Sequence, residues 1–274
     1  AYDWLPTSAA AEAEPVGDLF SFLVTLGALV FFGVFGTLLY SILFYRAARS
    51  DATDAPPIRG NAKLEITWTV IPILLVMWIA GYSYIIYQRM NILGSLPIVH
   101  LHAPLEAPAY AETGTNNTQP DEKIEVIAKQ WSWSFRYPSR NVTSTELHLP
   151  VNQRVHLLMQ SKDVLHGFYV PNFRIKQDIV PNRTIELKFI PNRVGKYQLH
   201  DSQFSGTYFA LMEADVYVDS PETYDRWLAQ ASTQQPVPAA NRAISEHSQP
   251  VTTPLQGRWP TVPPAKPPIV HSAQ

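Results

Sequence analysis

Cysteine is absent from all 274 residues of this sequence, and an excess of either charge is lacking as well. Without thiols the chain can form neither a disulfide nor a Cys-based zinc site. The 21 basic and 23 acidic residues leave a formal net charge of -2, which gives no indication of nucleic-acid binding. Apolar residues make up 46% of the chain and gather toward the N-terminus, whereas many of the 24 prolines lie near the C-terminus.

Two uncharged segments are long enough to cross a bilayer, which requires roughly 20 apolar residues. They run from Leu19 to Tyr45 and from about Ile66 to Tyr87. The first is too long for a cleaved signal peptide and follows acidic rather than basic residues. The sequence therefore predicts a transmembrane hairpin, with helices at 19–45 and 65–87 joined by residues 46–64.

Basic residues in the segment between these helices, namely Arg46, Arg49, Arg59 and Lys63, indicate the orientation of the hairpin. The positive-inside rule places this segment in the cytoplasm. Residues 1–18 and everything after the second helix are then expected on the opposite side, in a periplasm or a lumen. The chain begins without an initiator Met, which fits removal of a leader and an artificial start equally.

The rest of the chain divides by composition. Residues 88–120 form an irregular connector, and residues 121–219 contain short alternating apolar runs punctuated by prolines, as in a Greek-key sandwich of about 100 residues. Ser220 as an N-cap predicts a short helix over 220–230. Residues 231–274 are rich in Pro, Gln, Ser and Thr, so disorder or an extended path along a partner is expected. The expected fold class is α+β, with a two-helix transmembrane hairpin, a β-barrel and a disordered Pro-rich tail.

Four motifs together resemble subunit II of the haem-copper respiratory oxidases. They are LEITWTVIP at 64–72, QWSWSFRY at 130–137, DVLHGFYVP at 163–171 and DSQFSGTYFALM at 201–212. The resemblance extends over most of the chain and implies a cupredoxin-like barrel after the hairpin. It also implies two partners, subunit I, which holds the haems and the CuB ion, and subunit III.

The last motif departs from the family at the positions that bind the dinuclear copper centre CuA. In the cytochrome c-oxidising members this loop reads Cys-x-x-x-Cys-x-x-x-His-x-x-Met, and a further histidine lies upstream. His166 and Met212 match this pattern, whereas Asp201 and Ser205 replace the cysteines and Phe209 replaces the histidine. A mixed-valence copper pair needs soft thiolates. We therefore expect no metal and no cofactor in this chain, with Phe209 filling the vacated space.

Two further features of the family are expected to have a different role in a chain without CuA. In the cytochrome c-oxidising relatives, a Trp of the aromatic strand that contains Trp131 and Trp133 accepts the electron and passes it to CuA. Without copper that role has no acceptor, and packing is the expected role. Gln203 stands where the family has a Glu that helps to bind magnesium. A neutral amide is a weaker ligand for a hard cation, so this ion is expected to be absent or held by subunit I.

Glu65 is the residue of this chain most suited to chemistry. The resemblance places it at the cytoplasmic mouth of a proton pathway that leads into subunit I, where a carboxylate at the membrane boundary could collect protons from water. The alternative is that Glu65 only stabilises the positive end of a helix dipole, which contributes roughly 0.3–1 kcal/mol.

A mononuclear copper site is the alternative to a metal-free loop. His200 lies beside the loop and could join His166, Asp201 and Met212 as a mixed set of N, O and S donors. Strand alternation, however, points neighbouring residues 200 and 201 to opposite faces, which disfavours this site.

Loss of CuA is typical of the quinol oxidases, and the chain resembles most the subunit II of the cyanobacterial alternative respiratory terminal oxidase. The expected function is therefore that of a non-catalytic subunit of a proton-translocating quinol oxidase. Subunit I would contain the active centre and bind plastoquinol or ubiquinol, and cytochrome c would not be a partner. The expected location is a bacterial plasma membrane or a thylakoid membrane. Two alternatives stay open: an electron-accepting subunit with an atypical copper site, and a membrane-tethered copper-binding β-sandwich.

Overall fold

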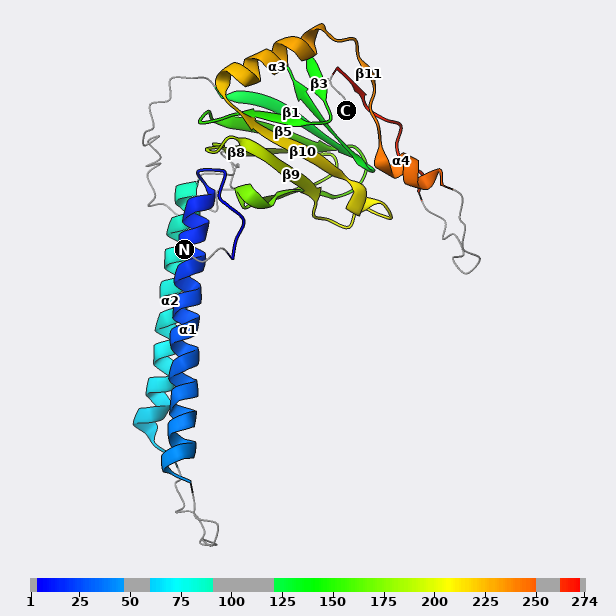
Figure 1. Cartoon of the computed structure of the whole chain (residues 1–274). Helices are drawn as coiled ribbons and strands as arrows, with labels where there is room; N and C mark the ends of the chain where they lie inside the picture. Colours follow the sequence, from blue (N-terminus) through cyan, green and yellow to red (C-terminus); the bar gives the residue numbers. More distant parts are fainter. Residues whose placement is uncertain (1–3, 47–59, 91–120, 250–261, 272–274) are drawn as a thin grey trace, which may run out of the picture. The chain divides into compact units, whose positions relative to one another are not determined.

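A computed structural model describes residues 4–46, 60–90, 121–249 and 262–271 (Figure 1). The chain separates into two compact units. The helical unit comprises Pro15–Met90, and the β unit comprises the first 14 residues together with residues 91–274. The predicted connector lies outside the described residues from position 91 onward, as do two of the basic residues used for the orientation, Arg49 and Arg59.

The helical unit consists of two long antiparallel helices, α1 (Ala13–Phe44) and α2 (Ala62–Met90) (Figure 1). With 32 and 29 residues, each exceeds the roughly 30 Å thickness of a hydrocarbon core at 1.5 Å rise per residue. The helices contact each other through aromatic side chains, since the ring of Phe22 lies 5.1 Å from Trp78 and 5.4 Å from Tyr82. The predicted hairpin is thus present.

The first helix begins six residues before the predicted start at Leu19. Residues 13–18 are polar enough to look like an external segment, but Glu14 in the first turn favours the positive end of the helix dipole. Upstream of it, Ala9 and Ala10 are fully buried on the β unit. There Ala10 forms a β-bridge with Pro191, so the N-terminal segment is part of the sandwich edge.

The β unit is a sandwich of two five-stranded sheets, as expected from the alternating runs. In spatial order, the first sheet contains β3 (Val142–Ser144), β2 (Ser132–Tyr137), β1 (Glu122–Lys129), β5 (Val155–Ser161) and β8 (Thr184–Phe189). The second contains β4 (Leu147–Pro150), β10 (Glu213–Asp219), β9 (Gly195–Asp201), β6 (His166–Val170) and β7 (Ile175–Ile179). The pairs β1–β5 and β4–β10 are parallel, and the other pairs are antiparallel.

Alternation along the strands explains the core. On β5, residues Val155, Leu157 and Met159 are fully buried, while the residues between them are partly exposed. In the parallel pairing, Val126 of β1 lies opposite Met159, so the first sheet presents a continuous apolar face to the second. The core lies between the two sheets.

The predicted aromatic strand is two elements rather than one continuous run. Trp131 lies in the turn between β1 and β2, and only Trp133 and the aromatic residues after it lie on β2. The run had looked continuous because its apolar residues recur at every second position through the turn. Trp131 and Trp133 are both 2% exposed, so both belong to the core.

The Pro-rich tail is not disordered throughout, contrary to the expectation from its composition. Helix α3 (Pro221–Thr233) extends three residues beyond the predicted end, and β11 (Val237–Pro238), α4 (Arg242–His247) and β12 (Ile269–Val270) follow. Fully buried Val270 anchors the segment, and His271 N donates to Thr143 O on the terminal strand β3 at 2.8 Å. The composition of the tail does not predict this order, because the order comes from hydrogen bonds to the unpaired backbone groups of an edge strand.

Candidate functional site

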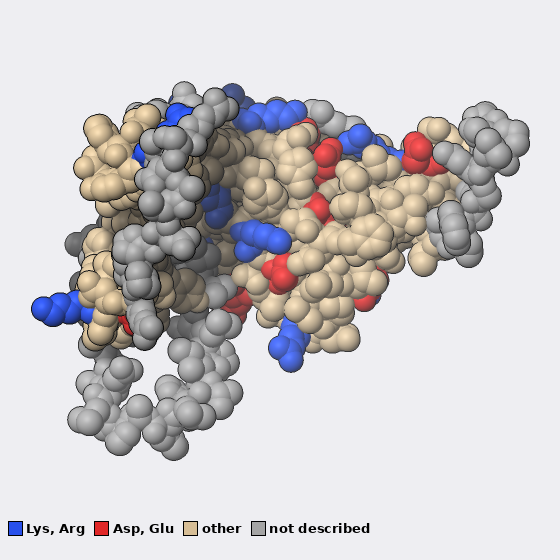
Figure 2. Space-filling view, turned by 90° about the horizontal axis from the view of Figure 1, so that it is seen from below, with Lys and Arg blue, Asp and Glu red and all other residues tan. Residues whose placement is uncertain are grey.

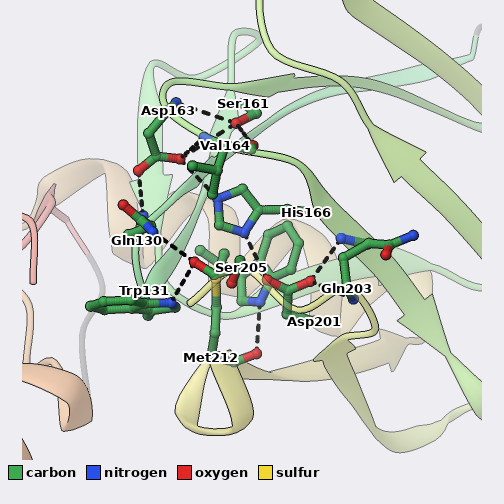
Figure 3. A network of polar contacts seen from close by, with 12 residues as sticks. Gln130, Trp131, Ser161, Asp163, Val164, His166, Asp201, Gln203, Ser205 and Met212 are labelled. Carbon is green, nitrogen blue, oxygen red and sulfur yellow. Dashed lines mark hydrogen bonds and ion pairs between the residues drawn. The ribbon is translucent and has the colours of Figure 1, made fainter. Parts of the chain in front are cut away.

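The degenerate loop motif closes over the buried end of β6. Strand β6 begins at His166, β9 ends at Asp201, and the turn between β5 and β6 contains Asp163. The Nδ1 atom of His166 lies 2.7 Å from Asp201 Oδ2, and its Nε2 atom lies 2.9 Å from Asp163 Oδ1 (Figure 3). Both nitrogens of one fully buried imidazole are therefore engaged by carboxylates.

Hydrogen bonds from the turn after β1 hold the middle of the loop. The backbone oxygen of Ser205 accepts from Gln130 Nε2 at 2.6 Å and from the indole Nε1 of Trp131 at 3.2 Å (Figure 3). Farther along, Trp133 Nε1 donates to Met212 O at 3.1 Å. The two tryptophans thus act as hydrogen-bond donors that fix both parts of the loop.

The environment shifts the acid–base equilibria of this cluster. Burial by itself lowers the pKa of His166, but the hydrogen bonds and charges of Asp163 and Asp201 outweigh burial and raise the pKa above its ordinary value. For Asp163, burial works toward a higher pKa, whereas hydrogen bonds from His166 and from backbone N–H groups bring the pKa below its ordinary value. Both shifts favour the charged forms, which attract each other.

These residues do not fit a CuA centre. No thiolate is available anywhere in the chain, and an oxygen donor is a poor substitute for it toward copper(I). Both ring nitrogens of His166 face carboxylate oxygens at hydrogen-bond distance, which leaves no lone pair directed at a metal. Among the residues that the structure describes, no group of three or more His, Asp or Glu side chains is arranged to hold a metal ion.

The structure brings most of the predicted loop positions together but not all of them. His166, Asp201, Ser205 and Met212 converge in one buried region (Figure 3). Phe209 lies in a short 3-10 helix (Phe209–Leu211), where its ring is partly buried and contacts the exposed Phe204 ring at 5.0 Å. Phe209 was expected to fill the vacated space, but its described ring contact is with Phe204. The group that lies against His166 Nδ1 is the Asp201 carboxylate.

His200 lies apart from this region, as strand alternation predicts. Its side chain is 36% exposed and its Nδ1 atom lies 3.3 Å from Glu213 Oε1, whereas Asp201 is buried on the other face of β9. Gln203 also points away from the imidazole, since its Nε2 atom donates to Asp178 Oδ1 at 2.8 Å. In these positions His166 and His200 could not coordinate the same metal ion.

Asp163 belongs to the site although the sequence does not predict this role for it, and it lies in the same motif as His166. The signal was an acid three residues before His166, with a second acid, Asp201, at a position that contacts this histidine in the fold. Nor does the sequence predict the role of Gln130, whose backbone N–H donates to Asp163 Oδ2 at 2.7 Å. These partners depend on how the loops pack, which no local pattern specifies.

Glu65, the candidate for proton uptake, belongs to the helical unit and lies in the first turn of α2. The side chain of Asn61 caps this helix end, because its Oδ1 atom accepts from the backbone N–H groups of Lys63 at 3.1 Å and Leu64 at 3.3 Å. The Glu65 side chain is exposed. A carboxylate here can exchange protons with water.

Comparison with known proteins gives matches in both units. Residues 2–86 match the transmembrane domain of cytochrome c oxidase subunit II, and residues 141–218 match its periplasmic domain. Cytochrome c oxidase subunit 2 of Synechocystis is 30% identical, over 88% of this chain and 79% of its own length. The protein of the same name from Thermostichus vulcanus is 32% identical, over 92% and 86%. Quinol oxidase subunit 2 of Bacillus spizizenii is 25% identical, over 82% and 65%.

These matches agree with the two long apolar helices and the β-sandwich. The chain is anchored in a membrane by its N-terminal hairpin, and its C-terminal domain is periplasmic. It belongs to the subunit II family of the haem-copper oxidases.

Proposed function

We propose that this chain is subunit II of a haem-copper quinol oxidase and binds neither CuA nor another metal. The observation that carries the proposal is the Asp201 carboxylate, which replaces the first thiolate and lies 2.7 Å from His166 Nδ1. Electrons then have no copper pair to pass through in this subunit. They would enter subunit I from a lipid-soluble quinol that subunit I itself binds.

The surroundings of Trp131 support a donor other than a soluble protein. Trp131 is only 2% exposed, and the ring of Tyr208 contacts it edge-on at 5.0 Å. The chain's own C-terminal segment reaches this turn, because Ala265 N donates to Gln130 O at 2.7 Å. An electron carrier docking at this edge would meet the tail before it met the indole.

Charge on one face of the molecule fits the same conclusion. On the face seen in Figure 2, Lys and Arg lie between Asp and Glu side chains and neither sign forms a continuous field. A soluble electron carrier is steered to its partner by a patch of complementary charge. Interspersed charges offer little steering of this kind.

The remaining parts of the proposal concern protons and partners. Exposed Glu65 at the start of α2 would take up protons for a pathway in subunit I. Subunit I would carry the haems and CuB, and subunit III would be a further partner. The chain itself would anchor the complex and cover its outer face, with no catalytic group of its own.

Oxygen consumption by the purified complex tests the proposal. Reduced quinol and reduced cytochrome c are compared as electron donors, and copper and haem are quantified in the same sample. We expect turnover on quinol only, with the one copper of subunit I per complex. Turnover on cytochrome c with additional copper would refute the proposal and favour the atypical copper site.

A further inference from the structure

His166 lies between two carboxylates, and this arrangement limits how protons can be distributed over the three side chains. Its side chain and that of Asp201 are fully buried, and that of Asp163 is 22% exposed. A neutral imidazole has one N–H donor and one acceptor nitrogen, so it can satisfy only one ionised carboxylate. Either the ring carries two protons, or one of the acids carries one.

Backbone N–H groups donate to one oxygen of the Asp201 carboxylate, and the imidazole faces the other oxygen. Oδ1 accepts from Gly167 N at 2.7 Å and from Gln203 N at 3.1 Å, while Oδ2 faces the imidazole. A carboxylate that accepts several backbone N–H groups is stabilised in its ionised form. A proton on Oδ1 would have to displace these donors.

Asp163 is arranged in the same way from the other side of the ring. Its Oδ2 atom accepts from Gln130 N at 2.7 Å, and Oδ1 accepts from Val164 N at 2.7 Å in addition to facing His166 Nε2. Each acid thus accepts backbone N–H groups and also presents one oxygen to the imidazole, an arrangement that a ring with two N–H donors would satisfy on both sides.

We propose that Asp163, His166 and Asp201 form a carboxylate–imidazolium clamp. In this clamp the buried imidazolium of His166 holds the loop in place, a role that a metal ion would have in a chain with the complete ligand set. The clamp joins three segments that are distant in sequence: the turn after β1, the turn before β6 and the loop after β9. Loss of one member is costly, because it leaves an uncompensated buried charge.

Close packing of the loop on β6 fits this role. Ser202 N donates to Gly167 O at 3.0 Å, and a Cβ atom at Gly167 would collide with the Ser202 side chain and lie 3.1 Å from Gln203 N. The loop therefore lies directly against the backbone of β6. This contact brings Asp201 within reach of the imidazole.

The clamp predicts a defined dependence of stability on pH. The pKa of His166 is raised above the unfolded value of about 6.5, so its contribution is complete below about pH 6.5 and is lost as pH rises through the raised value. The pKa of Asp163 is lowered from about 3.9, so its contribution is complete above about pH 4 and is lost as pH falls through the lowered value. Asp178, linked to the loop through Gln203, is the further carboxylate near the cluster.

Thermal unfolding of the full chain in detergent, prepared without added copper, tests the clamp. The melting temperature is followed by tryptophan fluorescence, because the Trp133 ring lies 6.2 Å from the His166 ring. We expect His166→Gln to lower the melting temperature by roughly 10 °C or more near pH 5.5, and by clearly less near pH 9.5. The matched control His200→Gln removes a half-exposed histidine that faces one acid, and should cost no more than about 3 °C at either pH.

Asp201→Asn provides a second variant if His166→Gln does not fold. The amide keeps the shape of the carboxylate and can donate to a neutral imidazole, so this variant should fold. Its decline in stability above pH 6.5 should be smaller than that of the wild type, because only Asp163 then favours the charged ring. Equal losses for His166→Gln and His200→Gln, or an unchanged pH profile in Asp201→Asn, would refute the clamp. Copper measured in the same samples separates the two proposals. Two coppers per chain would overturn the metal-free reading as well, whereas a copper-free chain that fails the stability test overturns the clamp alone.

Discussion

Replacing Trp131 by Phe separates an electron-transfer role from a packing role. The change removes the indole N–H that donates to Ser205 O at 3.2 Å, but this oxygen keeps its bond from Gln130 Nε2 at 2.6 Å. Because no buried acceptor is left without a partner, the lost hydrogen bond should cost only about 1 kcal/mol. The smaller ring also leaves a void beside Gly206, where an added Cβ atom would lie 2.8 Å from the indole, and this should cost about 1 kcal/mol more.

The sum of about 2 kcal/mol corresponds to a fall in melting temperature of roughly 8 °C for a domain of this size. Oxygen consumption driven by quinol should be unchanged at temperatures well below the melting point, since no electron crosses this side chain. Trp227→Phe on α3 is a matched control, because Trp227 stacks on His148 at 3.8 Å, away from the loop. It should lower stability without affecting quinol turnover.

A large loss of quinol-driven turnover in Trp131→Phe would refute this reasoning. If the indole carried electrons, its replacement should slow oxygen consumption by on the order of tenfold or more, while the melting temperature and the haem content stayed sufficient for a folded complex. Normal turnover in the Trp227→Phe control would then locate the defect at Trp131.

Three other predictions follow from the same structure. Glu65→Gln should slow quinol oxidation by roughly an order of magnitude if this carboxylate collects protons, whereas equal rates in variant and wild type would leave Glu65 only with its interaction with the helix dipole. Tyr137→Phe should lower the free energy of unfolding by about 3 kcal/mol in a denaturant titration, because the Tyr137 hydroxyl accepts from His148 N at 2.7 Å and donates to His148 O at 3.2 Å. A change below about 1 kcal/mol would contradict this. Gly167→Ala should cost about 1–3 kcal/mol through displacement of the loop at Ser202, and an unchanged melting temperature would show that the loop yields freely.

Much of the fold could be predicted because its signals are local. The two uncharged runs carry enough apolar residues to form membrane helices whatever their neighbours are, and alternation on β5 or β10 assigns the buried face of a strand. The order of strands and the parallel pairing of β1 with β5 could not be predicted in this way. They depend on which edges meet once the two sheets pack, and an alternating pattern fits either direction.

The tail shows how composition can mislead. Four of residues 262–271 are prolines, and only Val270 among their apolar side chains is fully buried, so burial of its own side chains could not order this segment. Order comes from outside the segment, because the terminal strand β3 presents backbone groups at Thr143 that the tail satisfies. One buried side chain, Val270, then adds apolar contact. A segment can be ordered by the edge that it covers, although nothing in its own sequence indicates that edge.

The candidate site could be predicted only in part from the sequence. The sequence identifies which ligands are missing, because Asp201 and Ser205 stand at fixed spacing from Met212. It does not identify what replaces them. The replacement depends on the distance from Asp201 to His166, which are 35 residues apart and meet because β6 pairs with β9. Asp163 then completes the cluster from a turn whose side chain could have faced solvent. The contacts of a departed ligand position must therefore be read from the fold, since Asp201 stands at such a position whereas Asp163, the second acid beside His166, lies outside the ligand pattern.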